Sequence, residues 1–396
     1  MAAVDGRSLY RAAIAVSALG LTLFSTGANA QDCETKVGVV GPMSGGAALW
    51  GLSARNGVEI AAAEFNQTGG IPMGGKKCKV VVLSYDSKYS AEGAAAAANS
   101  LASEGVSVIV GPVGSPEATG IKPVAERNKQ VTMNFGYNKE AIGTKWPLAF
   151  HAVPGPSAWA KPVAKMAKEK FDIKSVVVVA PNDQGGTDVA SSAVEAYREL
   201  GVNAKEEYYQ RGTTNFAPLV ARIMQSSPSA IDVCSSPPGD AATMVKQLLE
   251  AGFKGIFGRL GGTATEEIVR GAGGIEALGN FYWLESVNVA PAHLETAAAR
   301  QKSLGQTPAN NVTVAMFAAA GRLALKAISN AGTSTDGPKV AQELRKLPID
   351  DLWLGKGDWT GMPAYGIRQE FGFPVGFGLI ANGKNLGVTP VSVVGR

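Results

Sequence analysis

Two glycine-rich loops that each follow a short apolar run are the segments best suited to hold a ligand. Residues 41–46 read Gly-Pro-Met-Ser-Gly-Gly, and residues 111–117 read Gly-Pro-Val-Gly-Ser-Pro-Glu. In the second loop Ser115 is a preferred helix N-cap, and Pro116 occupies the preferred first helical position. The free N–H groups and the dipole of such a helix would hold a carboxylate. Ordinary turn and capping chemistry explains the same residues, so both interpretations stay open.

Residues that could support catalysis do not form a recognisable pattern. Neither loop has the glycine spacing of a dinucleotide-binding turn or the Gly-Lys-Ser/Thr of a P-loop. Residues 42–46 approach a nucleophile elbow, but Pro42 stands where that motif requires glycine. The two histidines, His151 and His293, are too few for a His-ligated metal site. They are also remote in sequence from the serines of the two loops, so no catalytic triad is indicated. We therefore predict no enzymatic activity, no metal and no cofactor.

The elements that position the two loops alternate between strands and helices. Short β-branched runs alternate with Ala-rich amphipathic segments over residues 36–135, and the same rhythm restarts at residue 157 and continues to 251. Strands separated by helical crossovers form a parallel sheet with helices on both faces. The fold class predicted is α/β, with two similar lobes of parallel sheet.

The connection between the lobes and the tail of the chain set the predicted domain boundaries. Residues 146–156 contain three prolines and are interpreted as a crossing between lobes. The tail contains a strand-like run at 281–287, a long helix over Val312–Ala331, and a segment rich in glycine and aromatic residues; it is expected to complete both lobes. We assign residues 31–152 and about 280–372 to lobe 1, and residues 153–279 and about 373–396 to lobe 2. Small ligands bind in clefts between domains, so we expect the site there.

Composition excludes several other classes of protein. Hydrophobic residues make up 45% of the chain and charged residues 18%, which is too apolar for intrinsic disorder. The net charge of +4 comes from 37 basic and 33 acidic residues scattered along the chain. Without a cluster of lysine and arginine, we predict no nucleic-acid partner.

The first thirty residues have the organisation of a secretory signal. Arg7 and Arg11 precede an apolar stretch at 12–24, and small residues at 25–30 end in Ala30. The apolar stretch is shorter than the roughly 20 residues that span a bilayer, which argues against a membrane anchor. We predict cleavage after Ala30 and an exported, soluble mature protein.

Export makes the three cysteines interpretable. Cys33 and Cys78 each precede an apolar run, so both lie at one end of the sheet if those runs are neighbouring parallel strands. A disulfide and two unpaired thiols both remain open at this point. Cys234 is expected to be a free thiol.

Several segments resemble one family. Residues 36–46, Trp50-Gly51, 57–61, 65–66 and 69–71 are similar to the opening of periplasmic substrate-binding proteins of ABC transporters, of the leucine/isoleucine/valine-binding class; residues 106–112, 215–223 and 251–253 continue the resemblance. The resemblance implies a type I periplasmic binding protein, with two Rossmann-like lobes joined by three crossings. Such a protein is periplasmic and monomeric, closes over a small ligand, and delivers it to an inner-membrane permease.

The resemblance also implies which residues of the first lobe bind the ligand. The family holds the ligand's carboxylate with one loop and one strand end, and covers it with an aromatic residue. Hydrophobic packing between the lobes is the alternative role for such an aromatic side chain in this sequence. In this sequence those positions are Val113, Gly114 and Ser115 in the loop, Phe135, Gly136 and Tyr137 at the strand end, and Trp50 as the cover.

The second lobe departs from the family's pattern. Family members that hold an α-amino group place a tyrosine near Gln184 and Gly185 and an acidic residue near Gly261, and many have an aromatic residue near Ser236 and Pro237. A buried ammonium without a charged partner costs several kcal/mol. We therefore expect the ligand to be an aromatic or other bulky carboxylate rather than an amino acid. A ligand-sensing receptor and a secreted α/β hydrolase are the alternative functions.

Overall fold

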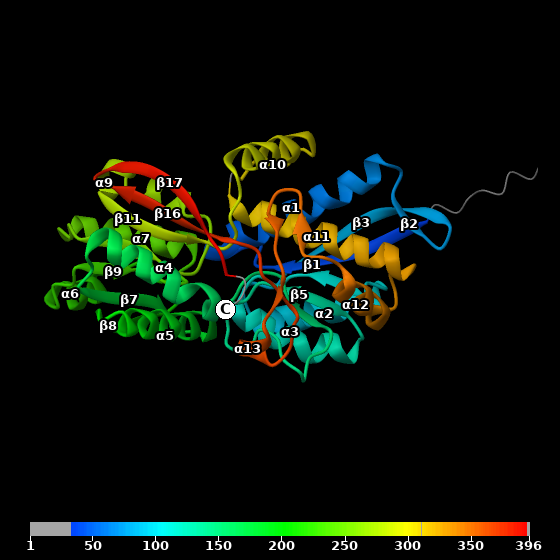
Figure 1. The fold of residues 1–396 in the computed structure, drawn as a ribbon, viewed down its shortest axis with the longest axis horizontal. Helices are drawn as coiled ribbons and strands as arrows, with labels where there is room; N and C mark the ends of the chain where they lie inside the picture. Colours follow the sequence, from blue (N-terminus) through cyan, green and yellow to red (C-terminus); the bar gives the residue numbers. More distant parts are fainter. Residues whose placement is uncertain (1–32, 310, 394–396) are drawn as a thin grey trace, which may run out of the picture. The chain divides into compact units, whose positions relative to one another are not determined.

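The structure is a computed structural model that describes residues 33–309 and 311–393 (Figure 1). The predicted signal segment and its cleavage after Ala30 lie outside the described residues. Helices and strands alternate through most of the described chain, and the strands form two large sheets and one small two-stranded sheet, β12 (Asp350–Asp351) with β13 (Gly355–Lys356).

The first sheet has the strand order β14-β15-β6-β5-β4-β1-β3-β2 and is parallel except at its two edges. Each edge strand, β2 or β14, pairs antiparallel with its neighbour. The strands are β1 (Glu34–Gly41), β2 (Ile71–Met73), β3 (Lys76–Asp86), β4 (Val108–Val110), β5 (Val131–Asn134), β6 (Ala149–His151), β14 (Trp359–Thr360) and β15 (Glu370–Phe371).

Helices from both ends of the chain belong to this first lobe. Gly57 allows two of them, α1 and α11, to approach closely, since a Cβ at that position would lie 2.4 Å from the carbonyl oxygen of Val314. Helix α11 is long and apolar enough to cross a membrane, yet 89% of its most apolar window is buried, as in a core helix. The helices are η1 (Gly45–Ala47), α1 (Ala48–Gln67), α2 (Ala91–Ser103), α3 (Ser115–Arg127), α10 (Pro291–Ser303), α11 (Val312–Ala331), α12 (Gly337–Lys346) and α13 (Met362–Tyr365).

The second sheet has the order β17-β16-β11-β10-β9-β7-β8. The strands from β11 to β8 in this order are parallel, and β16 and β17 form an antiparallel hairpin at the β11 edge. Alternate residues of β7 point to opposite faces: Val176 and Val178 join a core that includes residues of α4 and α5, and Val177 and Val179 one that includes residues of α6 and α7. The strands are β7 (Ser175–Pro181), β8 (Asn203–Tyr209), β9 (Ala230–Asp232), β10 (Ile256–Arg259), β11 (Asn280–Glu285), β16 (Val375–Ala381) and β17 (Lys384–Val391). The helices are α4 (Pro156–Phe171), α5 (Gln184–Glu199), α6 (Ala217–Gln225), α7 (Pro238–Glu250), α8 (Glu266–Gly271) and α9 (Ile275–Leu278).

The chain passes between the two sheets three times, after β6, after β11 and after β15. One predicted boundary needs correction. Residues 280–285 were assigned to lobe 1, but β11 pairs with β10 in the second sheet, so the second crossing follows Glu285. The physical reason is that Phe281 and Trp283 are buried in the apolar core of the second lobe.

Candidate functional site

A small cavity lies where the carboxyl-terminal ends of several strands of both sheets meet. Ligands of open parallel sheets bind at this end of the strands. The first lobe contributes the segments after β3, β4 and β5 together with α1 and α11, and the second lobe contributes the segments after β9, β10 and β11. The lining residues are Trp50, Tyr89, Val113, Gly114, Ser115, Phe135, Tyr137, Ser235, Gly262, Thr263, Ser286, Thr313 and Met316.

The N-terminus of α3 forms one wall of the cavity. The helix starts at Ser115, one residue earlier than predicted, with Gly114 in extended conformation as its N-cap. The Glu117 side chain supports this start, because its carboxylate accepts the Gly114 N–H at 2.5 Å. Ser115 is almost fully buried where it borders the cavity. The geometry therefore retains the helix terminus that the sequence suggested for a carboxylate.

Glu117, in the first turn of α3, does not line the cavity, and its side chain is completely buried. One carboxyl oxygen accepts a hydrogen bond from the Ser87 hydroxyl, and the other accepts the Gly114 N–H. Burial raises the pKa of Glu117 to about 7, although these hydrogen bonds and the charge of Arg211 oppose the rise. The side chain thereby joins the loops that carry Tyr89 and Gly114.

Four aromatic side chains surround the cavity. The Trp50 indole, which lies in the first turn of α1 rather than in the preceding loop, donates to the Thr263 carbonyl oxygen at 3.4 Å and lies 6.1 Å from the Tyr89 ring. Phe135 both lines the cavity and stacks on Phe317, with 3.8 Å between ring centroids. The Tyr137 hydroxyl donates to the Ser286 hydroxyl at 2.5 Å.

The second lobe supplies hydroxyl groups and glycine. The Thr313 hydroxyl of α11 donates to the Thr263 hydroxyl at 2.6 Å, which joins the two lobes beside the cavity. Gly185 is not among the lining residues, but a Cβ there would lie 3.1 Å from the Ser115 hydroxyl oxygen and 3.3 Å from that of Tyr89. Glycine at this position lets the start of α5 approach the first lobe closely.

Other residues predicted for the site do not line the cavity. Gly261 has φ of +75°, and a Cβ there would point toward Val189 and Trp159 in the interior of the second lobe. Its neighbour Gly262 lines the cavity instead. The other predicted residues are also absent from the lining. Gly136 lies against Ser115, Gln184 accepts a hydrogen bond from Thr119, Ser236 donates to the Cys234 carbonyl oxygen, and Pro237 is the N-cap of α7.

Sequence reasoning missed the remaining lining residues. Tyr89 and Ser235 follow β3 and β9, so the rule that ligands lie beyond strand ends would have found them. Thr313 and Met316 lie on α11, far along the chain, and no local signal connects them to the site.

Among the residues that the structure describes, those lining the cavity include no acidic or basic side chain. Two arginines that do not line the cavity contact residues that do. Arg211 stacks on the Tyr89 ring at 4.0 Å and is ion-paired with Asp183 at 2.5 Å. Arg259 donates to the Thr263 carbonyl oxygen at 2.9 Å. The lining itself can offer aromatic faces, hydroxyl groups and backbone N–H groups, but no charge.

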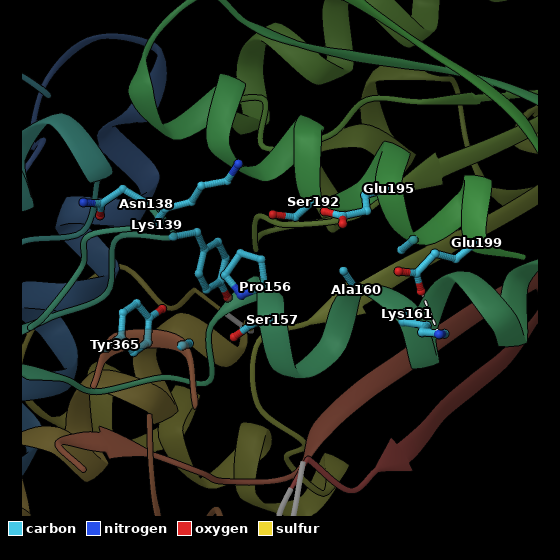
Figure 2. A pocket seen from close by; sticks show the side chains of 13 residues that line it. Asn138, Lys139, Pro156, Ser157, Ala160, Lys161, Ser192, Glu195, Glu199 and Tyr365 are labelled. Carbon is cyan, nitrogen blue, oxygen red and sulfur yellow. Dashed lines mark ion pairs between the residues drawn. The ribbon is translucent and has the colours of Figure 1, made fainter. Parts of the chain in front are cut away.

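A larger pocket lies beside the cavity and shares Tyr137 with it (Figure 2). Its walls come from the loop at Lys139, from residues of α4 and α5, and from Tyr365. The charged groups there are solvent-exposed, as in the ion pair between Lys161 and Glu199 at 2.7 Å. We assign the ligand site to the smaller cavity, because it lies at the strand ends.

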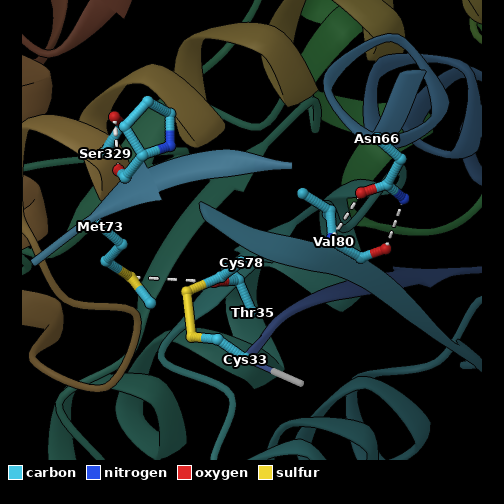
Figure 3. The surroundings of a disulfide bond; sticks show 8 residues. Cys33, Thr35, Asn66, Met73, Cys78, Val80 and Ser329 are labelled. Atoms are coloured by element: carbon cyan, nitrogen blue, oxygen red, sulfur yellow. Dashed lines mark hydrogen bonds between the residues drawn. A yellow bond between two sulfur atoms is a disulfide. The ribbon is translucent and has the colours of Figure 1, made fainter. Parts of the chain in front are cut away.

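The two N-terminal cysteines form a disulfide bond (Figure 3). The register of β1 with β3 pairs Glu34 with Lys79, which places Cys33 beside Cys78. Nearby, the Asn66 side chain exchanges two hydrogen bonds with the backbone of Val80, at 2.9 and 2.7 Å, and so ties α1 to β3. Cys234 is a buried free thiol.

Comparisons with known proteins agree with this architecture. A Leu/Ile/Val-binding protein homologue of Brucella abortus is 25% identical over 371 residues, 89% of each chain. The structure of a branched-chain amino acid transporter substrate-binding protein from Streptococcus pneumoniae, in complex with isoleucine, has a TM-score of 0.76 and 20% identity and covers 91% of this chain and 99% of that one. An ABC transporter solute-binding protein from R. palustris, in complex with benzoate, has a TM-score of 0.71 and 17% identity, over 91% and 97%.

The family model described as "Periplasmic binding protein" matches residues 34–365, which is most of the chain. That family consists of solute-binding proteins rather than enzymes, and the similar structures share its fold of two lobes. The chain therefore belongs to the periplasmic binding protein family.

Proposed function

We propose that this protein binds a small carboxylate without an ammonium group, of the aromatic carboxylate class, and delivers it as a monomer to the permease of an ABC importer. The observation that carries the proposal is the uncharged lining of the cavity. An α-amino acid brings an ammonium into the site, and burying it without a carboxylate partner costs several kcal/mol. A carboxylate alone can be stabilised by hydrogen bonds from backbone N–H groups and hydroxyls.

The walls of the cavity match the two parts of such a ligand. Ser115 at the N-terminus of α3 can receive the carboxylate, because the helix dipole and free N–H groups favour an anion there. Trp50, Tyr89 and Phe135 can cover an aromatic ring, since aromatic pairs prefer stacked or edge-to-face contacts. The solute-binding protein from R. palustris that was solved with benzoate shows that this fold can hold an aromatic carboxylate.

The test is thermal unfolding of the purified mature protein with a panel of ligands. The panel contains leucine, isoleucine, valine, benzoate and larger aromatic carboxylates. A ligand at 1,000 times its Kd stabilises the native state by about 4 kcal/mol, which shifts the midpoint of unfolding clearly. A shift with aromatic carboxylates and none with the amino acids supports the proposal. A shift with the branched-chain amino acids contradicts it and would require an acidic residue from outside the present lining to hold the ammonium.

A further inference from the structure

Arg259 at the end of β10 is a buried cation that forms no ion pair within the described part of the chain. Its side chain is fully buried, and within residues 33–309 and 311–393 its Nε and Nη1 atoms have no hydrogen-bond partner. Only Nη2 is bonded, to the Thr263 carbonyl oxygen at 2.9 Å. Arg322, also buried, is different: it is ion-paired with Glu64 at 2.7 Å and with Asp351 at 3.0 Å.

The guanidinium of Arg259 lies directly behind the second-lobe wall of the cavity. A Cβ built on Gly262 would stand 2.8 Å from Nη2, and Gly262 lines the cavity. Thr263, whose carbonyl accepts from Arg259, is also a lining residue and accepts the Trp50 indole N–H at 3.4 Å. Two lining residues, Gly262 and Thr263, are therefore in direct contact with this charged group.

Three acidic residues, Asp232, Glu266 and Glu285, interact electrostatically with Arg259. None of the three forms an ion pair with it within 4 Å in the described part of the chain. Burial lowers the pKa of Arg259 to about 10, so the side chain remains charged at neutral pH. Burial also raises the pKa of Glu285, whose carboxylate accepts the Trp283 indole N–H at 2.7 Å, to about 7. In an interior of low dielectric constant, an uncompensated charge acts across several ångströms.

We propose that Arg259 selects the charge of the ligand: it favours an anion in the cavity and disfavours an ammonium, acting through the wall formed by Gly262 and Thr263. Arg259 is then a specificity-determining residue that does not touch the ligand. The inference rests on the proposed function, because it assumes a carboxylate ligand. It also explains why the chain retains an unpaired arginine in its interior, since the bound anion compensates that charge.

The experiment varies the charge of the residue and the charge of the ligand together. Binding of benzoate, of its neutral analogue benzamide and of leucine is measured by calorimetry for the wild type, Arg259→Met, Arg259→Lys and a control, Arg270→Met. Arg270 lies on the exposed side of α8, so its replacement changes the net charge equally without changing the cavity. We expect the wild type to prefer benzoate, and Arg259→Met to weaken benzoate binding roughly tenfold while benzamide binding changes less than threefold. Arg259→Lys should keep most of the preference, and Arg270→Met all of it.

The outcomes separate this inference from the proposed function. Equal loss of benzoate and benzamide binding in Arg259→Met would mean that the arginine only holds the wall in place, and would overturn the inference. An unchanged preference for benzoate in that variant would do the same, and the proposed function would stand. Binding of leucine by the wild type, with neither benzene derivative bound, would overturn both. If Arg259→Met does not fold, Arg259→Gln provides the same comparison. A wild-type protein that binds benzamide more tightly than benzoate would also overturn the role of Arg259.

Discussion

Glu117 connects the two loops that form the first-lobe wall of the cavity, through hydrogen bonds to Ser87 and Gly114. It stands beside the helix terminus proposed to receive the ligand's carboxylate. The ionisable groups that influence it are Asp86, Tyr89 and Arg211, and Arg211 is already ion-paired with Asp183. An arriving anion would therefore meet a carboxyl that titrates near neutral pH.

Ligand binding should consequently be coupled to proton uptake at Glu117. The pKa of about 7 rises further when an anion binds nearby, so the complex holds the proton more tightly than the free protein does. Affinity for benzoate should increase roughly three- to tenfold as pH falls from 8 to 6. Calorimetry in buffers with different heats of ionisation measures the proton uptake directly.

Glu117→Gln is the matched variant for this coupling. The amide oxygen can still accept the Gly114 N–H, but the side chain no longer titrates. We expect the variant to bind benzoate with an affinity that is nearly constant between pH 6 and 8. A pH dependence equal to that of the wild type would assign the proton to another group.

At the scale of elements, the disulfide fixes the end of the first sheet at which β1 and β3 start. The bond closes a loop with a sequence separation of 45 residues. Constraining a loop of this length in the unfolded chain stabilises the native state by up to about 4 kcal/mol in the chain-entropy description, and native disulfides typically contribute 2–4 kcal/mol.

The double variant Cys33→Ala, Cys78→Ala should lose about 2–4 kcal/mol of unfolding free energy. Urea unfolding of both proteins measures the difference. Reductant serves as the control, because it should destabilise the wild type and leave the double variant unchanged, while Cys234 is present in both. Equal midpoints for the oxidised wild type and the double variant would show that the bond does not stabilise the fold.

Most elements could be predicted from local pattern. The run of four valines at 176–179 lies within β7, as its β-branched residues predict, and the apolar stretch over Val312–Ala331 coincides with α11. The assignment of residues 280–285 failed because a strand's own residues do not specify which sheet it joins. That choice depends on the free edge offered by β10, a non-local property.

Apart from Trp50 in α1, the predicted residues that line the cavity all follow a strand end. The loop at Val113 to Ser115 was found because a helix start directly after a strand has a recognisable signature. Gly262 rather than Gly261 lines the cavity because of the backbone direction: at a φ of +75°, a Cβ on Gly261 would point toward the lobe interior. The local sequence predicts neither the backbone direction at Gly261 nor the contribution of Thr313, on α11, to the cavity.

At the scale of the whole molecule, several buried carboxyls influence how stability depends on pH. Asp232 is fully buried, accepts the Leu260 N–H at 2.9 Å, and accepts the hydroxyls of Tyr197 and Tyr282 at 3.1 Å. Burial raises its pKa from 3.8 to about 6, and Glu117 and Glu285 are each raised from 4.5 to about 7. A carboxyl whose pKa is raised by folding binds a proton more tightly in the folded state, so protonation stabilises the fold.

The protein should therefore become less stable as pH rises from about 4 to 7. We expect a higher Tm at pH 5.5 than at pH 8, measured by calorimetry without ligand. Asp232 alone accounts for about 2–3 kcal/mol over its window, since each pKa unit corresponds to about 1.4 kcal/mol. Asp232→Asn should reduce the slope of Tm against pH, whatever its effect on Tm at one pH. A variant slope identical to that of the wild type would contradict this role.

The pairing of α1 with α11 has a consequence for how the chain becomes folded. These helices belong to one core, yet residues 48–67 and residues 312–331 lie at opposite ends of the sequence. During synthesis, the first lobe therefore cannot complete its interior until nearly the whole polypeptide has left the ribosome. Contacts between such distant segments form slowly, because loop closure must precede them. A chain that stays open until its last quarter appears is well suited to being threaded unfolded through a translocation channel.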